Sequence, residues 1–516
     1  MDRQFASRRQ LLFQAAVLAG AALSPAAWTS AVAQARIGDY PFRIGIASGE
    51  PLPDGVVLWT RLVTDPQAMD AGMGRAPVSV GWEIAEDEGL KRVVQRGQAL
   101  AVAEAGHSVH VEVAGLRPDR AYFYRFTAGG HASPVGRTRT APAPGAKVDK
   151  LRIAYGSCQK WEAGYYSAHA DLAKQDPDLV LFLGDYIYEK KTGKDVVRPH
   201  PDVEAQDLGS YRQRYAWYKA DPNLQAAHAC APWMVMWDDH EVSNDYGGDQ
   251  DRSNPPVAQF LKRRAAGYQA YFENMPLRRT ARPIGPDMHL YRATDWGRLA
   301  RLALIDDRQY RAHRSCDAQQ SENNEKLIPA ACPERFDPKR SMLGARQEAW
   351  LQSRLRDTPA RWNLLGQQTL MNAVVTPDKR VSNDGWDGYD QTRRRILEGW
   401  RDAKTSNPVV LGGDVHCFFA GDLALEPGGK PIASEFVGGS ISSLGRTKEV
   451  MDGMLAITPA LKFGDGQTRG YSQVDITDKE CLVTFRGVQN ALVPTSPVRD
   501  LAKFVVEDGE KGLKRA

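Results

Sequence analysis

The sequence has few cysteines, no strong excess of either charge and no long hydrophobic run beyond its first thirty or so residues. Six cysteines in 516 residues are too few to form a disulfide framework. Lysine and arginine exceed aspartate and glutamate by only 67 to 63, so we expect no basic groove for nucleic acid. No later stretch is apolar over the roughly 20 residues that a membrane-spanning helix needs. What remains is a chain with 42% hydrophobic residues, enough to build a sizeable core.

The first 33 residues resemble an export signal. Two arginines within residues 7–13 precede a short alanine-rich run over residues 15–27, and residues 31–33 are small, as a signal peptidase requires. This arrangement is typical of the twin-arginine export machinery, a transient partner. A retained membrane anchor is the alternative, but the run is short and Pro25 interrupts it. We therefore predict a cleaved leader over residues 1–33, a mature form without a membrane span, and location in the periplasm or outside the cell.

The pattern of the remaining chain changes near residue 145. Short apolar runs, several with period two, recur over residues 36–145 and predict an all-β sandwich domain. Residues 116–122 hold a Leu-x-Pro…Tyr pattern like the corner of fibronectin-type domains. A linker rich in proline and alanine follows at residues 141–145. We predict a catalytic α/β domain over residues 150–490 and a C-terminal strip or tail over residues 491–516.

Continuous apolar runs in the second domain predict strands that are covered on both faces. These runs are residues 151–155, 179–183, 233–237, 302–305, 362–365 and 409–411. Helices are expected at residues 343–357 and 391–403. Residues 482–485 are expected to form the last strand, followed by a charged, loosely ordered end at residues 510–516.

The cysteines fall into different settings. Cys316 and Cys332 flank a polar loop and could pair in an oxidising compartment, whereas Cys230, Cys417 and Cys481 look like isolated thiols. The sixth cysteine follows a predicted strand and belongs to a different group of residues.

Side chains that commonly bind metals follow four of the predicted strands. They are Cys158 after the first strand, Asp185 and Tyr188 after the second, Asp239, His240 and Asn244 after the third, and Asp414 and His416 after the sixth. In layered α/β folds, ligands bind beyond the carboxyl ends of the strands. Oxygen ligands suit hard cations, and a thiolate or phenolate favours iron or zinc. Taken singly, Cys158 and Tyr188 are equally compatible with ordinary core residues, but together the clusters indicate a metal site.

These clusters closely resemble motifs of the PhoD-like alkaline phosphatases, the alkaline phosphatase D family of the metallophosphoesterase superfamily. The matching stretches are Gly-Asp-x-x-Tyr at residues 184–188, Trp-Asp-Asp-His-Glu-Val-x-Asn-Asp at residues 237–245 and Gly-Asp-Val-His at residues 413–416. Residues 42–62 resemble the N-terminal signature of the same family. The resemblance implies an α/β metallophosphoesterase-like layered β-sandwich flanked by helices, with an N-terminal all-β fibronectin/Ig-like domain. It also implies a site for two or more metal ions, Fe³⁺ and Ca²⁺.

The resemblance assigns the ferric ion to three positions. Cys158, Asp185 and Tyr188 match the residues that bind it, and Asp185 would bridge to a neighbouring calcium ion. His240 matches the outer-sphere histidine of the superfamily and is the expected catalytic acid.

The resemblance also implies ligands for a second metal ion, but this sequence departs from the ligand pattern of the wider superfamily. Asp239 stands where the wider superfamily has an asparagine ligand, and Asn244 is a second candidate for the same ion. Asp414 and His416 match the last metal motif, but Asp414 replaces the first histidine found in purple acid phosphatases, and their Val-x-x-His motif has no full counterpart near Gln368. More oxygen ligands and fewer nitrogens favour calcium over zinc or manganese.

The function expected from this reading is that of a secreted alkaline phosphatase that hydrolyses phosphate monoesters and diesters. A phospholipase D-like phosphodiesterase of the same superfamily is the alternative within the hydrolases. A non-catalytic extracytoplasmic binding protein with structural metals is the alternative from another class, although a structural metal site would not need His240 and Asn244 in addition to its ligands.

Overall fold

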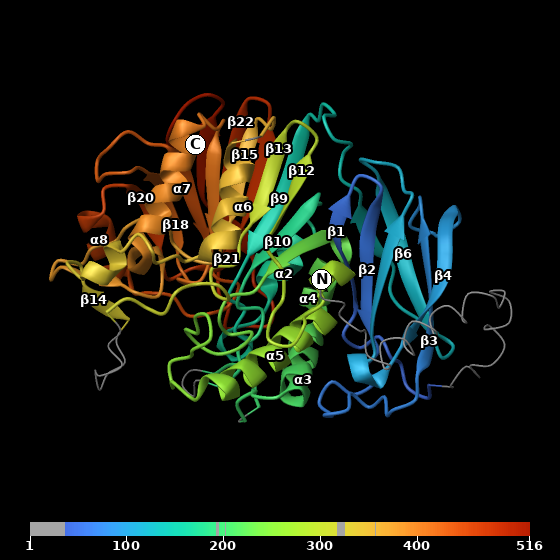
Figure 1. Cartoon of the computed structure of the whole chain (residues 1–516). Coiled ribbons are helices and arrows are strands. Elements are labelled where there is room, and N and C mark those ends of the chain that lie inside the picture. Colours follow the sequence, from blue (N-terminus) through green and yellow to red (C-terminus); the bar gives the residue numbers. More distant parts are fainter. Residues whose placement is uncertain (1–36, 192–195, 202, 317–325, 357) are drawn as a thin grey trace, which may run out of the picture.

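Two mixed β-sheets pack face to face in the computed structural model, with a smaller sheet beside them (Figure 1). The structure describes residues 37–191, 196–201, 203–316, 326–356 and 358–516, so the predicted leader lies outside the described residues. The ten-stranded sheet has the order β24 (Lys514–Arg515), β23 (Val498–Glu507), β22 (Glu480–Val488), β21 (Arg469–Thr477), β9 (Lys150–Gly156), β10 (Leu179–Leu183), β11 (Pro232–Met236), β1 (Ile46–Leu52), β2 (Gly55–Arg61) and β5 (Ser108–Ala114).

The second large sheet has seven strands. Their order is β12 (Arg292–Trp296), β13 (Ala300–Leu304), β15 (Trp362–Gly366), β17 (Pro408–Gly412), β19 (Ala433–Gly438), β18 (Phe418–Leu423) and β20 (Leu461–Asp465). Strands β9, β10, β11 and β1 are parallel to one another, and so are β13, β15, β17 and β19. The carboxyl ends of the parallel strands within each sheet therefore lie along one edge, where the polar clusters are expected.

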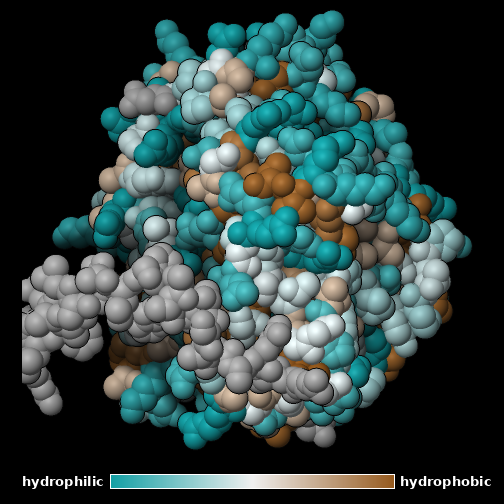
Figure 2. Space-filling model, turned by 90° about the vertical axis from the view of Figure 1, so that its right-hand side faces the viewer, coloured by the Kyte–Doolittle hydropathy of each residue, from teal (hydrophilic) through white to brown (hydrophobic). Residues whose placement is uncertain are grey.

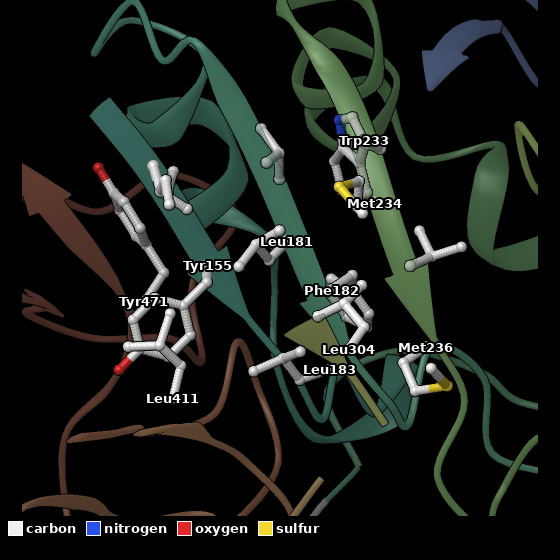
Figure 3. Close-up of a cluster of buried hydrophobic side chains, with 14 of the residues drawn as sticks. Tyr155, Leu181, Phe182, Leu183, Trp233, Met234, Met236, Leu304, Leu411 and Tyr471 are labelled. Carbon is white, nitrogen blue, oxygen red and sulfur yellow. The ribbon is translucent and has the colours of Figure 1, made fainter. Parts of the chain in front are cut away.

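The main core fills the space between the two sheets. Figure 3 shows Leu181 and Leu183 of β10 among Leu304 of β13 and Leu411 of β17, all of them buried. Strand β10 is buried at every position, which explains why its sequence is a continuous apolar run without alternation. All six apolar runs predicted as strands in this part of the chain overlap strands of the structure.

Helices cover the outer faces of both sheets. Those nearest the ten-stranded sheet are α2 (Ser167–Leu172), α3 (Leu208–Lys219), α4 (Pro222–Cys230) and α5 (Val257–Asn274). The seven-stranded sheet is covered by α6 (Gly344–Arg356) and α7 (Asp390–Asp402), and α8 (Lys448–Ile457) packs beside β20. The predicted helices at residues 343–357 and 391–403 correspond to α6 and α7. None of the helices that the structure describes is long and apolar enough to cross a membrane.

The N-terminal region is all-β, as predicted, but part of it joins the large sheet. Its own five-stranded sheet contains β4 (Val93–Ala101), β3 (Val78–Ala85), β6 (Ala121–Ala128), β7 (His131–Ala132) and β8 (Gly136–Arg139). Strands β1, β2 and β5 instead extend the ten-stranded sheet through β11. The Tyr122 hydroxyl accepts a hydrogen bond from the Arg117 N–H at 2.9 Å, the contact that the Leu-x-Pro…Tyr pattern predicts.

The outer side of the N-terminal region is mostly hydrophilic, with an apolar area near the middle of the view in Figure 2. Strand β4 is an edge strand, and its Val94 and Leu100 side chains are exposed. Trp59, Tyr122 and Tyr124 are buried core residues.

Two expectations about the C-terminus are wrong. Residues 482–485 lie in β22, which is not the last strand, because β23 pairs with it over its whole length and β24 pairs with β23. The predicted strip over residues 491–516 therefore contributes two strands, β23 and β24, to the large sheet. The buried Ala502, Phe504 and Val506 of β23 alternate with the exposed Lys503 and the half-buried Val505, so this strand lacks the fully buried apolar run of the central strands.

Cys316 and Cys332 form a disulfide with their Cα atoms 6.3 Å apart. The bond ties the segment before the short two-stranded sheet of β14 (Leu327–Pro329) and β16 (Arg380–Ser382) to the residues just after β14. Cys230, Cys417 and Cys481 are free thiols, as expected.

Candidate metal centre

The loops after β9, β10, β11 and β17 meet at one place. The Cys158 N–H donates to the Gly184 carbonyl at 3.1 Å, which joins the first loop to the second. Gly184 has a φ of +93°, and a Cβ there would lie 2.3 Å from the Asp238 Cβ, so only glycine lets the second and third loops approach this closely.

Six of the predicted site residues come together there. Cys158, Asp185 and His416 each offer a ligand atom, and these atoms lie within 4.8 Å of one another. Asp185, Asp239 and His240 form a second such group. The two groups share Asp185, the residue expected to bridge two ions. A carboxylate that belongs to both groups is the arrangement that a two-metal site requires.

The Tyr188 hydroxyl lies among the ligand atoms of the first group. Its oxygen lies 2.7 Å from Asp185 Oδ2, 3.1 Å from His416 Nε2 and 2.8 Å from Ser443 Oγ. The Ser443 hydroxyl in turn donates to the Cys158 carbonyl at 2.8 Å. The phenol oxygen, the carboxylate and the imidazole nitrogen thus point at a shared position.

The backbone at the site is held in a conformation that is rare for residues with side chains. Cys158, Asp185, Asp245, Asp414 and His416 have φ values between +56° and +59°. Each such residue costs on the order of 1–3 kcal/mol unless the surroundings enforce it, and such strain concentrates at functional sites. The tight turns aim side chains from different strand ends at one point.

The electrostatics of the site favour a cation. Burial, together with the nearby Asp185 carboxylate, raises the pKa of the Cys158 thiol and of the Tyr188 phenol well above their ordinary values. Burial also raises the pKa of Asp185. The buried Oδ1 atoms of Asp185 and Asp239 have no hydrogen-bond partner among the described residues. A bound cation would supply the missing partner and stabilise the thiolate and phenolate forms, so the residues fit a metal site.

Asp414 and Asn244 lie beside these groups. The half-buried Asp414 accepts a hydrogen bond from Thr369 Oγ1 at 2.7 Å on its Oδ2 atom. The Asn244 N–H donates to Glu189 Oε1 at 3.1 Å, and the Asn244 side-chain amide forms no hydrogen bond within the described ranges. Asp414 belongs to none of the three groups of close ligand atoms among the described residues, and the ligand roles of Asp414 and Asn244 stay predictions.

The two histidines are oriented by hydrogen bonds on their Nδ1 atoms. His416 Nδ1 lies 2.8 Å from the Leu444 carbonyl and can only donate to it, which leaves Nε2 free to accept or to bind a metal. His240 Nδ1 lies 2.5 Å from Glu189 Oε2. Burial lowers the pKa of His240, but the carboxylates of Glu189, Asp239 and Asp185 outweigh it and raise the pKa to about 10. The imidazolium is the form that donates a proton.

Several residues of the site were not predicted. Glu189 is fully buried and holds both His240 and the Asn244 backbone. Glu241 accepts the Tyr186 N–H at 2.6 Å and the Asp238 N–H at 3.0 Å, and so connects two strand-end loops. Glu241 lies within the motif at residues 237–245, and Glu189 directly follows the motif at residues 184–188. These positions are the one signal that could have drawn attention to them.

A third group of carboxylates is already paired with cations. The atoms of Asp239, Asp245 and Asp384 lie within 4.8 Å of one another. Arg308 Nη1 lies 3.1 Å from Asp384 Oδ1, and Lys326 forms ion pairs with both Asp384 and Asp245. This part of the site is neutralised by the chain's own side chains.

The nearby side chains of Arg212, Arg214 and Gln368 have structural partners. Arg214 donates to the Tyr188 carbonyl at 2.7 Å, and Arg212 pairs with Glu273 at 2.6 Å. Gln368 binds the backbone of Ile305 and Asp307, so it does not act as a ligand in place of the missing histidine.

Four strand-end loops thus bring a shared carboxylate and two oriented histidines together in a candidate metal centre. Residues 153–485 match the family model described as PhoD-like phosphatase, and residues 27–142 match the model of its N-terminal domain. The chain is 41% identical over 492 residues to alkaline phosphatase D of Bacillus subtilis (strain 168), covering 92% of this chain and 82% of that protein. A solved structure titled "Structure of PhoD" superposes with a TM-score of 0.88 at 40% identity and 93% coverage of both chains.

The chain belongs to the PhoD-like phosphatase family. It is therefore an enzyme of the phosphoric ester hydrolase class, as the sequence motifs indicated.

Proposed function

We propose that this enzyme hydrolyses phosphate monoesters and diesters with a water molecule activated at a site for Fe³⁺ and Ca²⁺. The observation that carries the proposal is the pair of ligand groups joined by Asp185. Membership of a phosphatase family supports the reaction class. The proposal extends to export by the twin-arginine machinery and to location in the periplasm or outside the cell, for which the leader pattern at residues 7–33 is the support.

The proposal also covers details of the fold. The two face-to-face sheets with polar loops at their strand ends favour the metallophosphoesterase-like layered class. The Tyr122 corner favours a fibronectin/Ig-like class for the N-terminal domain.

The ligands divide into two sets around Asp185. Cys158, Tyr188 and His416 would hold the ferric ion, and Asp239 with Asn244 would hold calcium. Burial and the Asp185 carboxylate raise the pKa of Cys158 in the first set, and the Asp414 carboxylate adds to this rise. Metal ions in such a site lower the pKa of bound water from 15.7 toward about 7 and offset the charge on the phosphoryl oxygens.

The protein's own groups carry out the remaining steps. Glu189 accepts the Nδ1–H of His240, so His240 Nε2 is the nitrogen that can donate to a phosphoryl oxygen or to the leaving group. The Tyr188 ring lies against His240, with centroids 4.1 Å apart, and limits its rotation. Positioned acid catalysis of this kind contributes about 10²–10⁴-fold to the rate.

A panel of three substrates, measured with metal analysis, tests the proposed activity. Nitrophenyl phosphate, bis-nitrophenyl phosphate and phosphatidylcholine separate monoesterase, general diesterase and phospholipase D-like activity. We expect turnover of the first two by protein that contains iron and calcium. Absence of turnover of all three by metal-loaded protein would instead favour a binding protein.

Replacing Tyr188 by phenylalanine is expected to remove a visible absorption band. A phenolate bound to Fe³⁺ absorbs visible light by charge transfer, and the Tyr188 oxygen is the phenol oxygen nearest to Asp185 and His416. The control is Tyr165→Phe, whose hydroxyl contacts the Val197 carbonyl instead. A colourless wild-type enzyme that is free of iron and fully active would refute the iron assignment.

Replacing Glu189 by glutamine is expected to lower kcat by about 10–100-fold, the usual cost of losing a partner that orients a site residue. The amide cannot supply the negative charge that stabilises the imidazolium of His240, while iron and calcium contents should stay at wild-type levels because Glu189 is not a predicted ligand. Steady-state kinetics and elemental analysis measure the two effects. The control Glu204→Gln removes a partly exposed carboxylate that pairs with Arg263. Equal kcat values in the two variants would show that Glu189 does not position His240.

A further inference from the structure

A second polar cavity lies at the other end of the two sheets. Its volume is about 810 Å³, and it is bordered by segments that lead into β9, β13, β15 and β17 and by residues that follow β21 and β23. The metal centre lies beyond the carboxyl ends of β9 and β17, whereas this cavity lies before their amino ends. A strand of five residues such as β17 spans roughly 17 Å, so one small ligand cannot occupy both places.

The cavity is strongly cationic. It is lined by five cationic side chains and two carboxylates, an excess of three positive charges, whereas the whole chain carries a net charge of only +4. One of the carboxylates, Asp508, is already engaged, since it accepts hydrogen bonds from Arg361 at 2.6 Å and from Asn407 at 2.7 Å. Much of the positive charge at this end of the molecule is therefore not neutralised locally.

Three cations of the lining have no partner in the described part of the chain. Lys147, Arg298 and Lys404 form no ion pair and no side-chain hydrogen bond there. They come from three separate segments, before β9, between β12 and β13, and after α7. Lys511 is another cation of the lining. Burial, together with the positive charge of Lys430, lowers the pKa of Lys511, as expected where cations lie close together.

We propose that this cavity binds a phosphorylated small molecule that carries at least two negative charges. Several spare cations around one cavity call for a multiply charged ligand, and the planar fork of Arg298 suits phosphate oxygens. The volume lies within the about 300–1,000 Å³ of small-molecule sites, which favours a compact ligand over a polymer. A phosphate group could come from an ester or from the inorganic phosphate that a phosphatase releases, and the binding chemistry is the same.

Isothermal titration of the full, metal-loaded chain tests the proposal. The probes are inorganic phosphate and methylenediphosphonate, whose P–C–P bridge is not hydrolysed. We expect two classes of site in the wild type, one at the metal centre and one in the cavity. The variant Arg298→Glu with Lys404→Glu should weaken the second class at least about tenfold, while its kcat and KM for nitrophenyl phosphate stay unchanged. Asp185→Asn should remove the first class alone.

A control with the same change of charge distinguishes a site from general attraction. Arg43→Glu with Lys262→Glu replaces one exposed arginine and one exposed lysine outside the cavity. An equal loss of binding in this control, or a single class of site in the wild type that disappears in Asp185→Asn, would overturn the proposal. Hexaglutamate is the third probe, and tighter binding of this peptide than of the diphosphonate in the cavity would overturn the phosphate assignment.

Discussion

Replacing Asp185 by asparagine is expected to abolish turnover of nitrophenyl phosphate and to deplete the bound metal. Asp185 is the one residue that belongs to both of the ligand groups proposed for the two ions, and its Oδ1 atom has no partner among the described residues. Charge stabilisation by metal ions contributes several kcal/mol, and each 1.36 kcal/mol changes the rate tenfold. We therefore expect kcat/KM to fall by at least about 10³-fold.

The measurement pairs kinetics with elemental analysis of the same preparations. Asp378→Asn is the matched control, because it changes an exposed aspartate outside the site in the same way. The backbone φ of +56° at Asp185 is tolerated about as well by asparagine as by aspartate, so the variant should fold. Near wild-type activity and metal content in Asp185→Asn would end the proposal of a bridged metal pair.

The strands that position the site could be predicted because burial on both faces leaves a continuous apolar run. This held for β10 and β11, whose five residues are all buried. It failed for β23, where half-buried and exposed charged residues interrupt the pattern, and for β4, where every second side chain is exposed on an edge strand. The addition of β1 to the large sheet had no local signal, because parallel pairing with β11 depends on residues about 185 positions away in the sequence.

The convergence of the site could be anticipated for a physical reason. Polar residues directly after buried parallel strands share one edge of the sheet, and this placed Cys158, Asp185 and Asp239 near one another. The partners that orient and neutralise them could not be inferred in this way. Arg308 follows β13 of the other large sheet and Asp384 follows β16, and nothing in their local sequence specifies that Arg308 pairs with both Asp238 and Asp384.

A buried network beneath the metal centre carries the second large expected effect, which concerns stability. Arg308 is 1% exposed, pairs with Asp238 through Nε and lies 3.1 Å from Asp384 through Nη1. Asp384 is also held by Arg311 at 2.7 Å. Burial alone would raise the pKa of Asp384, but the positive charges of Arg308 and Arg311 outweigh burial and keep this pKa well below its ordinary value. Asp384 is therefore charged and depends on the guanidinium groups. Burial raises the pKa of Asp238 well above its ordinary value, and the Arg308 guanidinium opposes this rise.

Replacing Arg308 by methionine is expected to lower the free energy of unfolding by about 3–5 kcal/mol, because it removes the ion-pair partner of the buried Asp238 and one of the partners of the buried Asp384. Urea denaturation followed by fluorescence measures the change, and Arg401→Met is the control, since its pair with Asp402 is exposed and its loss should cost at most about 1 kcal/mol. If Arg308→Met alone does not fold, the double variant with Asp238→Asn should recover folded protein, because the buried carboxyl group that pairs with Arg308 is then replaced by a neutral amide. Equal midpoints for Arg308→Met and Arg401→Met would show that this network does not stabilise the fold.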